Sequence, residues 1–131
     1  MNTNLKLLYV DDSPTILDML SSTLLEIGYL ETKSAEDGLE ALALCEEEEF
    51  DFIITDINMP NMNGFEFIET LRNKYQYMST PILVLTTESS EEMKQHGYKV
   101  GATSWMVKPF TTKLLAESIE KTIQKVEEDS F

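Results

Sequence analysis

Polar residues of three kinds, carboxylates, hydroxyls and an amine, stand directly after four apolar stretches of this 131-residue chain. They are Asp11, Asp12, Asp56, Thr86, Thr87 and Lys108. One such residue alone carries little information, because a lone acidic residue commonly caps a helix and a lone lysine is commonly solvated. Clustered carboxylates, however, would repel one another and have raised pKa values unless a cation neutralises them. If the fold brings these residues together, the sequence predicts a metal site.

Oxygen atoms are the ligands that this set offers, and no cysteine or histidine stands beside it in the sequence. Such a set favours Mg²⁺ or Mn²⁺ over Zn²⁺. Mg²⁺ keeps several of its waters and often binds a substrate phosphate through one or two carboxylates. An aspartate carboxylate can attack phosphorus to give an aspartyl phosphate, while Mg²⁺ and Lys108 neutralise charge on the transferred oxygens. The predicted chemistry is therefore phosphoryl acceptance.

Five short apolar stretches alternate with five helix-like stretches, which predicts an α/β domain with a parallel sheet. The expected strands are Lys6 to Val10, Leu30 to Ser34, Phe52 to Thr55, Ile82 to Leu85 and Ser104 to Val107. The second is the most polar, with Glu31 and Lys33, and is expected at an edge. Because the carboxyl ends of parallel strands lie on one rim, the polar residues above would meet there.

Start signals and apolar stripes mark the helices. The start signals are Ser13 before Pro14, Asn63 with Glu66, and Ser89 with Glu92. The predicted core faces are Ile16, Leu20, Leu24 and Ile27 in the first helix, Phe67, Ile68, Leu71 and Tyr75 in the third, and Leu115, Ile119, Ile123 and Val126 in the last. Gly97 interrupts the fourth helix at a cost of about 1 kcal/mol relative to alanine. We expect a locally soft helix that Gly97→Ala would stiffen, unless the glycine permits close packing.

Charge and composition exclude several classes of protein. With 24 acidic and 10 basic residues the net charge is −14, which disfavours binding to nucleic acid. Cys45 is the lone cysteine, so no internal disulfide is expected, and it falls on a core stripe. The sequence has no long apolar run of the kind that indicates membrane insertion or a secretion signal. We expect a cytoplasmic monomer that forms a single domain over residues 1–131, with no output domain.

Four motifs resemble response-regulator receiver domains, and in particular the single-domain chemotaxis regulators of the CheY type. They are VDDSP from Val10, TDINMPNMNG from Thr55, PILVLTTESS from Pro81 and GATSWMVKPF from Gly101. They occur in the family's order and spacing, nearly from end to end. The resemblance implies a flavodoxin-like doubly wound sheet with strand order 2-1-3-4-5 and a site at the switch between strands one and three.

The resemblance also implies roles for single residues. Asp56 would be phosphorylated by a histidine kinase. Asp12 and Asp56 would bind Mg²⁺ directly with the backbone carbonyl of Asn58, and Asp11 would act through water. The phosphoryl oxygens would be bound by Lys108, Thr86 and the Thr87 amide. A cis bond between Lys108 and Pro109 would direct the lysine side chain into the site.

Two further roles follow from the resemblance. Asn58 and Glu88 would flank the path of the hydrolytic water and so set the lifetime of the phosphate. Thr86 would be coupled to the residue three positions before Lys108, which is Trp105 here, where Tyr or Phe is usual. An indole can donate one hydrogen bond and accept none, so a switch that needs a phenolic hydroxyl is not transferable. Alternatively, Trp105 is a half-buried strand residue with no switching role.

The resemblance implies a regulator of chemotaxis, with a CheA-type histidine kinase as donor, a flagellar-motor switch protein as target and a phosphatase as a further partner. A phosphorelay intermediate or phosphate sink would use the same chemistry. A phosphatase of the haloacid dehalogenase type is disfavoured, because Asn58 stands where those enzymes have a second acid. The intact acidic set argues against an unphosphorylated interaction module. The expected chemistry is self-phosphorylation and self-dephosphorylation, without turnover of an outside substrate.

His96 is interpreted as a surface residue.

Overall fold

The computed structural model describes residues 3–129 and has a five-stranded parallel sheet in the order β2-β1-β3-β4-β5. The strands are β1 (Leu7–Val10), β2 (Thr32–Ala35), β3 (Phe52–Thr55), β4 (Ile82–Thr86) and β5 (Ser104–Val107). The helices are α1 (Pro14–Ile27), α2 (Gly38–Glu47), α3 (Gly64–Arg72), α4 (Glu91–Val100) and α5 (Thr112–Asp129). The predicted flavodoxin-like α/β fold is confirmed. Within the described residues, no helix is long and apolar enough to cross a bilayer.

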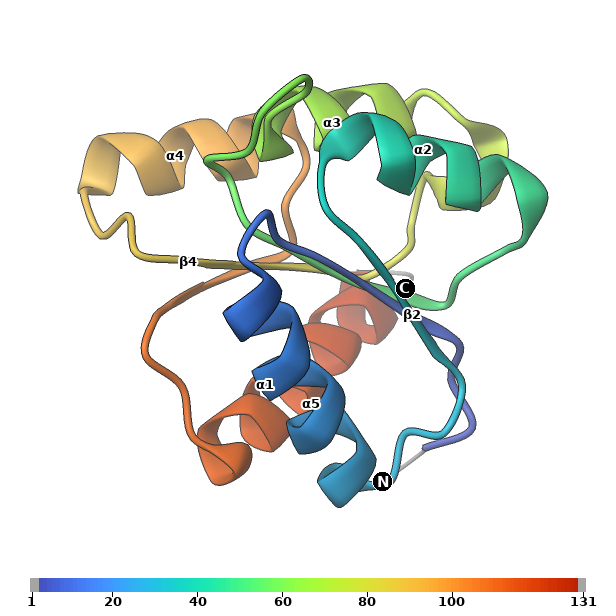
Figure 1. The fold of residues 1–131 in the computed structure, drawn as a ribbon. Coiled ribbons are helices and arrows are strands. Elements are labelled where there is room, and N and C mark those ends of the chain that lie inside the picture. The colour runs from blue at the N-terminus through green and yellow to red at the C-terminus, as the bar shows by residue number, and fades with distance from the viewer. Residues whose placement is uncertain (1–2, 130–131) are drawn as a thin grey trace.

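Helices cover both faces of the sheet, with α1 and α5 on one side and α2, α3 and α4 on the other (Figure 1). Successive residues of a strand point to opposite faces. In β1, Leu7 therefore packs with Leu20 and Leu115 on the α1 and α5 side, and Leu8 packs with Phe67 on the other side. This two-sided burial explains why β1, β3 and β4 are continuous apolar runs.

The polar strand β2 lies at an edge of the sheet, as the sequence predicts. It begins at Thr32 rather than Leu30, whose side chain is 78% exposed. Gly28 ends α1 with a φ of +122°, and Tyr29 then enters the core. Tyr29 is therefore buried and Leu30 is exposed to solvent before the chain pairs with β1.

Two of the three predicted helix starts are confirmed. Ser13 caps α1, and Asn63 and Glu66 form a reciprocal capping box at α3. The assignment of Ser89 is wrong, because Ser90 Oγ accepts the hydrogen bond from the Met93 amide and is the cap of α4. Both glutamates that follow then fall in the first turn of α4, where the positive end of the helix dipole stabilises them.

The third helix is shorter than the apolar pattern predicts. It ends at Arg72, and Tyr75 lies in a 3-10 turn with 89% of its surface exposed, so its assignment to the core face is wrong. Tyr77 is buried in its place. The Arg72 guanidinium, which donates to the carbonyl oxygens of Tyr77, Thr80 and Gly101, holds the connection in this shape and ends the helical periodicity.

Candidate functional site

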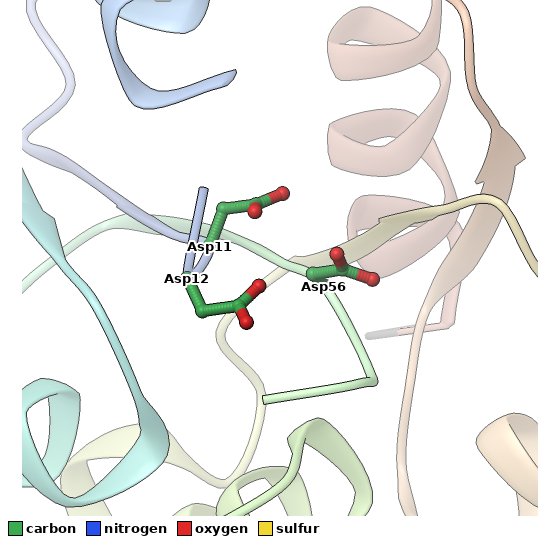
Figure 2. Close-up of side chains that lie close together, drawn as sticks. All are labelled: Asp11, Asp12 and Asp56. Atoms are coloured by element: carbon green, nitrogen blue, oxygen red, sulfur yellow. The ribbon is translucent and has the colours of Figure 1, made fainter. Parts of the chain in front are cut away.

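The carboxyl ends of β1 and β3 bring Asp11, Asp12 and Asp56 together (Figure 2). One carboxylate oxygen from each residue lies within 4.8 Å of those of the other two. The parallel register sets Val10 beside Thr55, and the Asp56 amide donates to the Val10 carbonyl at 2.9 Å. Asp11 and Asp56 are 2% and 8% exposed, whereas Asp12 faces solvent. The structure therefore makes one cluster of residues 45 positions apart in sequence.

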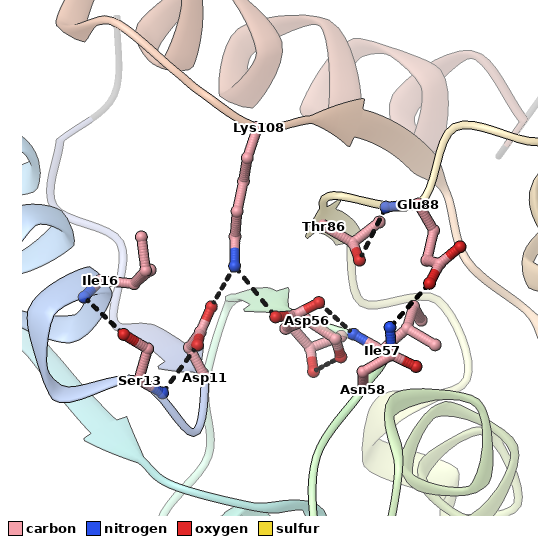
Figure 3. A network of polar contacts seen from close by, with 10 residues as sticks. Asp11, Ser13, Ile16, Asp56, Ile57, Asn58, Thr86, Glu88 and Lys108 are labelled. Carbon is pink, nitrogen blue, oxygen red and sulfur yellow. Dashed lines mark hydrogen bonds and ion pairs between the residues drawn. The ribbon is translucent and has the colours of Figure 1, made fainter.

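Lys108 enters this cluster from the end of β5. Its Nζ lies 2.7 Å from Asp11 Oδ2 and 2.9 Å from Asp56 Oδ2 (Figure 3). Its side chain is 11% exposed, so both ion pairs are largely shielded from water. The bond from Lys108 to Pro109 is cis, as the family resemblance implies. Burial alone would lower the pKa of Lys108, but the hydrogen bonds to both carboxylates outweigh it and the pKa is raised.

Backbone amides fix the remaining oxygens of the two buried carboxylates. Asp11 Oδ1 accepts from the Ser13 amide at 2.9 Å, and Asp56 Oδ1 accepts from the Ile57 amide at 2.7 Å (Figure 3). Burial raises the pKa of Asp11, and the hydrogen bonds from Lys108 and Ser13 offset only part of that rise. The two carboxylates are thus oriented before any ligand arrives, at a cost in desolvation that a bound cation would offset.

The donor set of the cluster fits a hard divalent cation. Its members are the carboxylates of Asp11, Asp12 and Asp56, and no histidine or cysteine belongs to it among the residues that the structure describes. Oxygen ligands suit Mg²⁺ or Mn²⁺, and the exposed Asp12 leaves the cluster open to solvent and to a phosphate. The cluster of carboxylates that the sequence predicts is therefore present.

The end of β4 lies beside the cluster and links it to Asn58. Thr86 is fully buried, and its Oγ1 accepts from the Glu88 amide at 3.4 Å, whereas Thr87 is exposed. Asn58 Nδ2 donates to Glu88 Oε1 at 2.9 Å (Figure 3). The sequence predicts both residues near the site but not the bond between them, because nothing local specifies contacts between residues 30 positions apart.

Trp105 contacts the same connection after β4. Its Nε1 donates to the carbonyl oxygen of Glu88 at 2.9 Å, and its ring stacks against Phe65 with centroids 6.3 Å apart. Gly97 of α4 is buried beside this ring. The close-packing interpretation of Gly97 is therefore correct. A Cβ there would overlap the indole, which argues against the expectation that Gly97→Ala would stiffen α4.

Phe65 is a contact residue that the sequence reasoning missed. It stacks on Trp105 and meets the ring of His96 edge to face with centroids 4.4 Å apart. An aromatic residue in the first turn of α3, next to the capping box, was the available signal. His96 itself is exposed and does not belong to the acidic cluster, in agreement with its interpretation as a surface residue.

Comparison with known proteins gives consistent matches over nearly the whole chain. Residues 7–120 match the model of the response regulator receiver domain. The structure of the chemotaxis response regulator CheY4 of Vibrio cholerae is similar with a TM-score of 0.86 and 51% identity, over 92% of this chain and 99% of that one. The chemotaxis protein CheY-3 of Vibrio cholerae is 33% identical over 96% of this chain and 97% of its own length. The chemotaxis protein CheY of Pseudomonas aeruginosa is 34% identical over 93% of this chain and 98% of its own length.

Proposed function

Because this chain belongs to the response regulator receiver domain family, we propose that it is a phosphorylation-activated regulator of a two-component system that accepts a phosphoryl group on Asp56. The observation that carries the proposal is the position of Lys108 Nζ, which is bonded to both Asp11 and Asp56 at the rim of the sheet. A carboxylate that faces an ammonium group and two further acids is equipped to bind a cation and to receive a phosphate.

Asp56 is the proposed nucleophile because it stands at the position that receiver domains phosphorylate, and its orientation is fixed by Lys108 at Oδ2 and by the Ile57 amide at Oδ1. One carboxylate oxygen attacks the phosphorus of a phosphohistidine on the kinase. The new O–P bond forms as the P–N bond breaks, and the departing imidazole takes a proton. In a separate dephosphorylation step, water attacks the phosphorus of the aspartyl phosphate, the O–P bond to Asp56 breaks, and inorganic phosphate and the free carboxylate are released.

Mg²⁺, or Mn²⁺, would be held by Asp12, Asp56 and the backbone carbonyl of Asn58, with Asp11 acting through water. When bound, the cation would neutralise negative charge on the transferred oxygens. Lys108 would supply a second positive charge from the end of β5, and it would exchange its bond to Asp56 for one to a phosphoryl oxygen. Thr86 and the Thr87 amide are the proposed donors to the other oxygens.

Asn58 and Glu88 are proposed to set the lifetime of the phosphate. Their hydrogen bond joins the loop after β3 to the loop after β4. In the proposed role, a water that attacks the phosphoryl group approaches Asp56 past this pair. If replacing both side chains left the rate of dephosphorylation unchanged, this role would be wrong.

Trp105 is proposed to report and stabilise the switched state through Glu88 rather than through a hydroxyl. Its indole donates to the Glu88 carbonyl, and the Glu88 amide donates to Thr86 Oγ1. When Thr86 turns toward a phosphoryl oxygen, that second bond must break and the loop that holds the indole must adjust. Phosphorylation would then change the face formed by α4, β5 and α5, with no phenolic group required.

A role in chemotaxis is the biological setting that we propose. The relatives described above carry the names of chemotaxis proteins, which supports a CheA-type histidine kinase as donor and a flagellar-motor switch protein as target. A phosphatase would be a further partner. Transfer assays with purified kinase, and motor-protein binding with and without phosphate, would separate this role from that of a phosphorelay intermediate or phosphate sink.

Fluorescence of Trp105, the only tryptophan, tests the central proposal. Mg²⁺ is added first, followed by beryllofluoride or acetyl phosphate, and the emission is recorded at each step. We expect the wild-type protein to respond to both additions. Asp56→Asn should lose the response to the phosphoryl donor, and an equal response in this variant would overturn Asp56 as the acceptor.

A further inference from the structure

We propose that Asp37 is a positioning residue of the phosphoryl-acceptor site, although it stands at the start of α2 and does not belong to the acidic cluster. Asp37 is the N-cap of α2, and its carboxylate also binds Asn61, in the loop that carries Asn58. The inference rests on the proposed function, since it concerns the carbonyl that Asn58 would offer to the metal.

The two oxygens of Asp37 make two different bonds. Oδ1 accepts from the Glu40 amide at 2.8 Å and so caps α2. Oδ2 accepts from Asn61 Nδ2 at 2.7 Å. Both bonds hold the charged form and lower the pKa of Asp37, the bond to the Glu40 amide being the larger cause. One carboxylate thus ties the start of a helix to the tip of a loop 24 residues further along the chain.

A backbone contact also joins the start of α2 to this loop. The Gly38 amide donates to the Met62 carbonyl at 3.1 Å, and a Cβ on Gly38 would lie 2.8 Å from that oxygen. Only a glycine lets the start of α2 approach the loop so closely. Asn61 has a φ of +67°, an uncommon conformation for a residue other than glycine, which its bond to Asp37 helps to hold.

The base of the same loop, next to Asp56, is also held by a close backbone contact. The Gly64 amide donates to the Ile57 carbonyl at 2.9 Å, and a Cβ on Gly64 would lie 2.2 Å from the carbonyl oxygen of Asp56. Asn58 therefore lies between two anchors, one at the base of the loop beside Asp56 and one at its tip against α2. Loss of the Asp37–Asn61 bond would leave the tip attached to α2 by the Gly38–Met62 backbone bond, and the backbone of Asn58 would be less firmly held.

Groups that orient a metal ligand without touching the metal typically change affinity by about 10- to 100-fold when they are removed. Asp37 acts through Asn61 and the loop backbone, so we expect an effect near the lower end of that range. Its role as a helix cap would be separate, because a cap stabilises α2 whether or not a metal is bound.

Two variants break the bond from opposite sides. Asp37→Ser keeps a good N-cap but has one oxygen, which cannot serve Glu40 and Asn61 together. Asn61→Gly leaves the cap intact and tolerates the positive φ. Asp51→Ser is the matched control, since Asp51 also accepts from a backbone amide and carries the same charge, but precedes β3 at the end of the strand away from the site.

The measurement is calorimetric titration of each full-length variant with Mg²⁺, followed by the half-life of the aspartyl phosphate formed from acetyl phosphate. We expect Asp37→Ser and Asn61→Gly each to weaken Mg²⁺ binding by about tenfold, the double variant to be no weaker than either single one, and Asp51→Ser to match the wild type. Unchanged Mg²⁺ affinity in both single variants would show that Asp37 is a helix cap and nothing more. Failure of the wild-type protein to form a phosphate on Asp56 would instead overturn the proposed function.

Discussion

The Cα of Gly97 in α4 packs against the six-membered ring of Trp105 in β5. A Cβ built on Gly97 would lie 2.5 Å from Cζ3 and 2.9 Å from Cε3 of the indole. The absence of a side chain at residue 97 and the size of the side chain at residue 105 are therefore matched. The same indole donates to the Glu88 carbonyl, so the packing of α4 is connected to the loop after β4.

We expect Gly97→Ala to destabilise the protein, although alanine is the better helix former by about 1 kcal/mol. The overlap with the indole would force Trp105 or α4 to move, and overpacking of this kind typically costs about 1–3 kcal/mol. Urea denaturation and the emission maximum of Trp105 should change together. The control is the same substitution in a Trp105→Phe background, where the smaller ring leaves room and Gly97→Ala should be neutral or stabilising.

Tyr77→Phe should lower the free energy of unfolding by about 1–3 kcal/mol, because it leaves buried polar groups without a partner. The Tyr77 hydroxyl accepts from the Phe50 amide at 3.1 Å and lies within donating distance of the carbonyl oxygens of Cys45 and Glu48. Urea denaturation measures the loss. Tyr75→Phe is the control, since that side chain is 89% exposed and should change stability by less than about 0.5 kcal/mol. Equal effects of the two substitutions would contradict a stabilising role for the hydrogen bonds of the Tyr77 hydroxyl.

The sheet and the acidic cluster were predictable from sequence because each depends on a strong local signal. Continuous apolar runs mark β1, β3 and β4, and the polar residues directly after them must share a rim once the strands are parallel. Local signals also placed the caps Ser13 and Asn63.

The features that were not predictable depend on contacts between distant segments. The helical pattern continues to Tyr75, but Arg72 binds carbonyl oxygens of the following connection and ends α3 early. Gly97 carries the same local propensity whether it softens a helix or accommodates a ring, and only the position of Trp105 decides between the two.

Cys45 should react slowly in the folded protein. It is 3% exposed, and burial raises the pKa of its thiol from 9.0 to about 11. At pH 8 the thiolate, which is the reactive form, would be on the order of one part in a thousand rather than about one in ten. Alkylation by iodoacetamide, followed by mass spectrometry, should be slow in buffer and fast in concentrated urea. Similar rates under both conditions would mean that Cys45 is accessible in the native state.

Lys108→Met should make the protein depend on Mg²⁺ for its stability. The ammonium lies between Asp11 and Asp56, whose side chains are 3% and 10% exposed, and its loss leaves two shielded carboxylates facing each other without a counter-charge. Removal of one partner from a buried ion pair typically costs about 3–5 kcal/mol, although protonation of one carboxylate would recover part of that cost.

Mg²⁺ would compensate the same two carboxylates, so the rise in melting temperature on its addition should be larger for Lys108→Met than for the wild-type protein. Thermal denaturation with and without the metal measures this difference. Lys125→Met is the matched control, because the Lys125 side chain is exposed and donates to the Thr103 carbonyl instead of a carboxylate. It should leave the Mg²⁺ response unchanged. If Lys108→Met responded to Mg²⁺ no more than this control, the ammonium and the cation would not share the same carboxylates, and the proposed metal site would have to lie elsewhere.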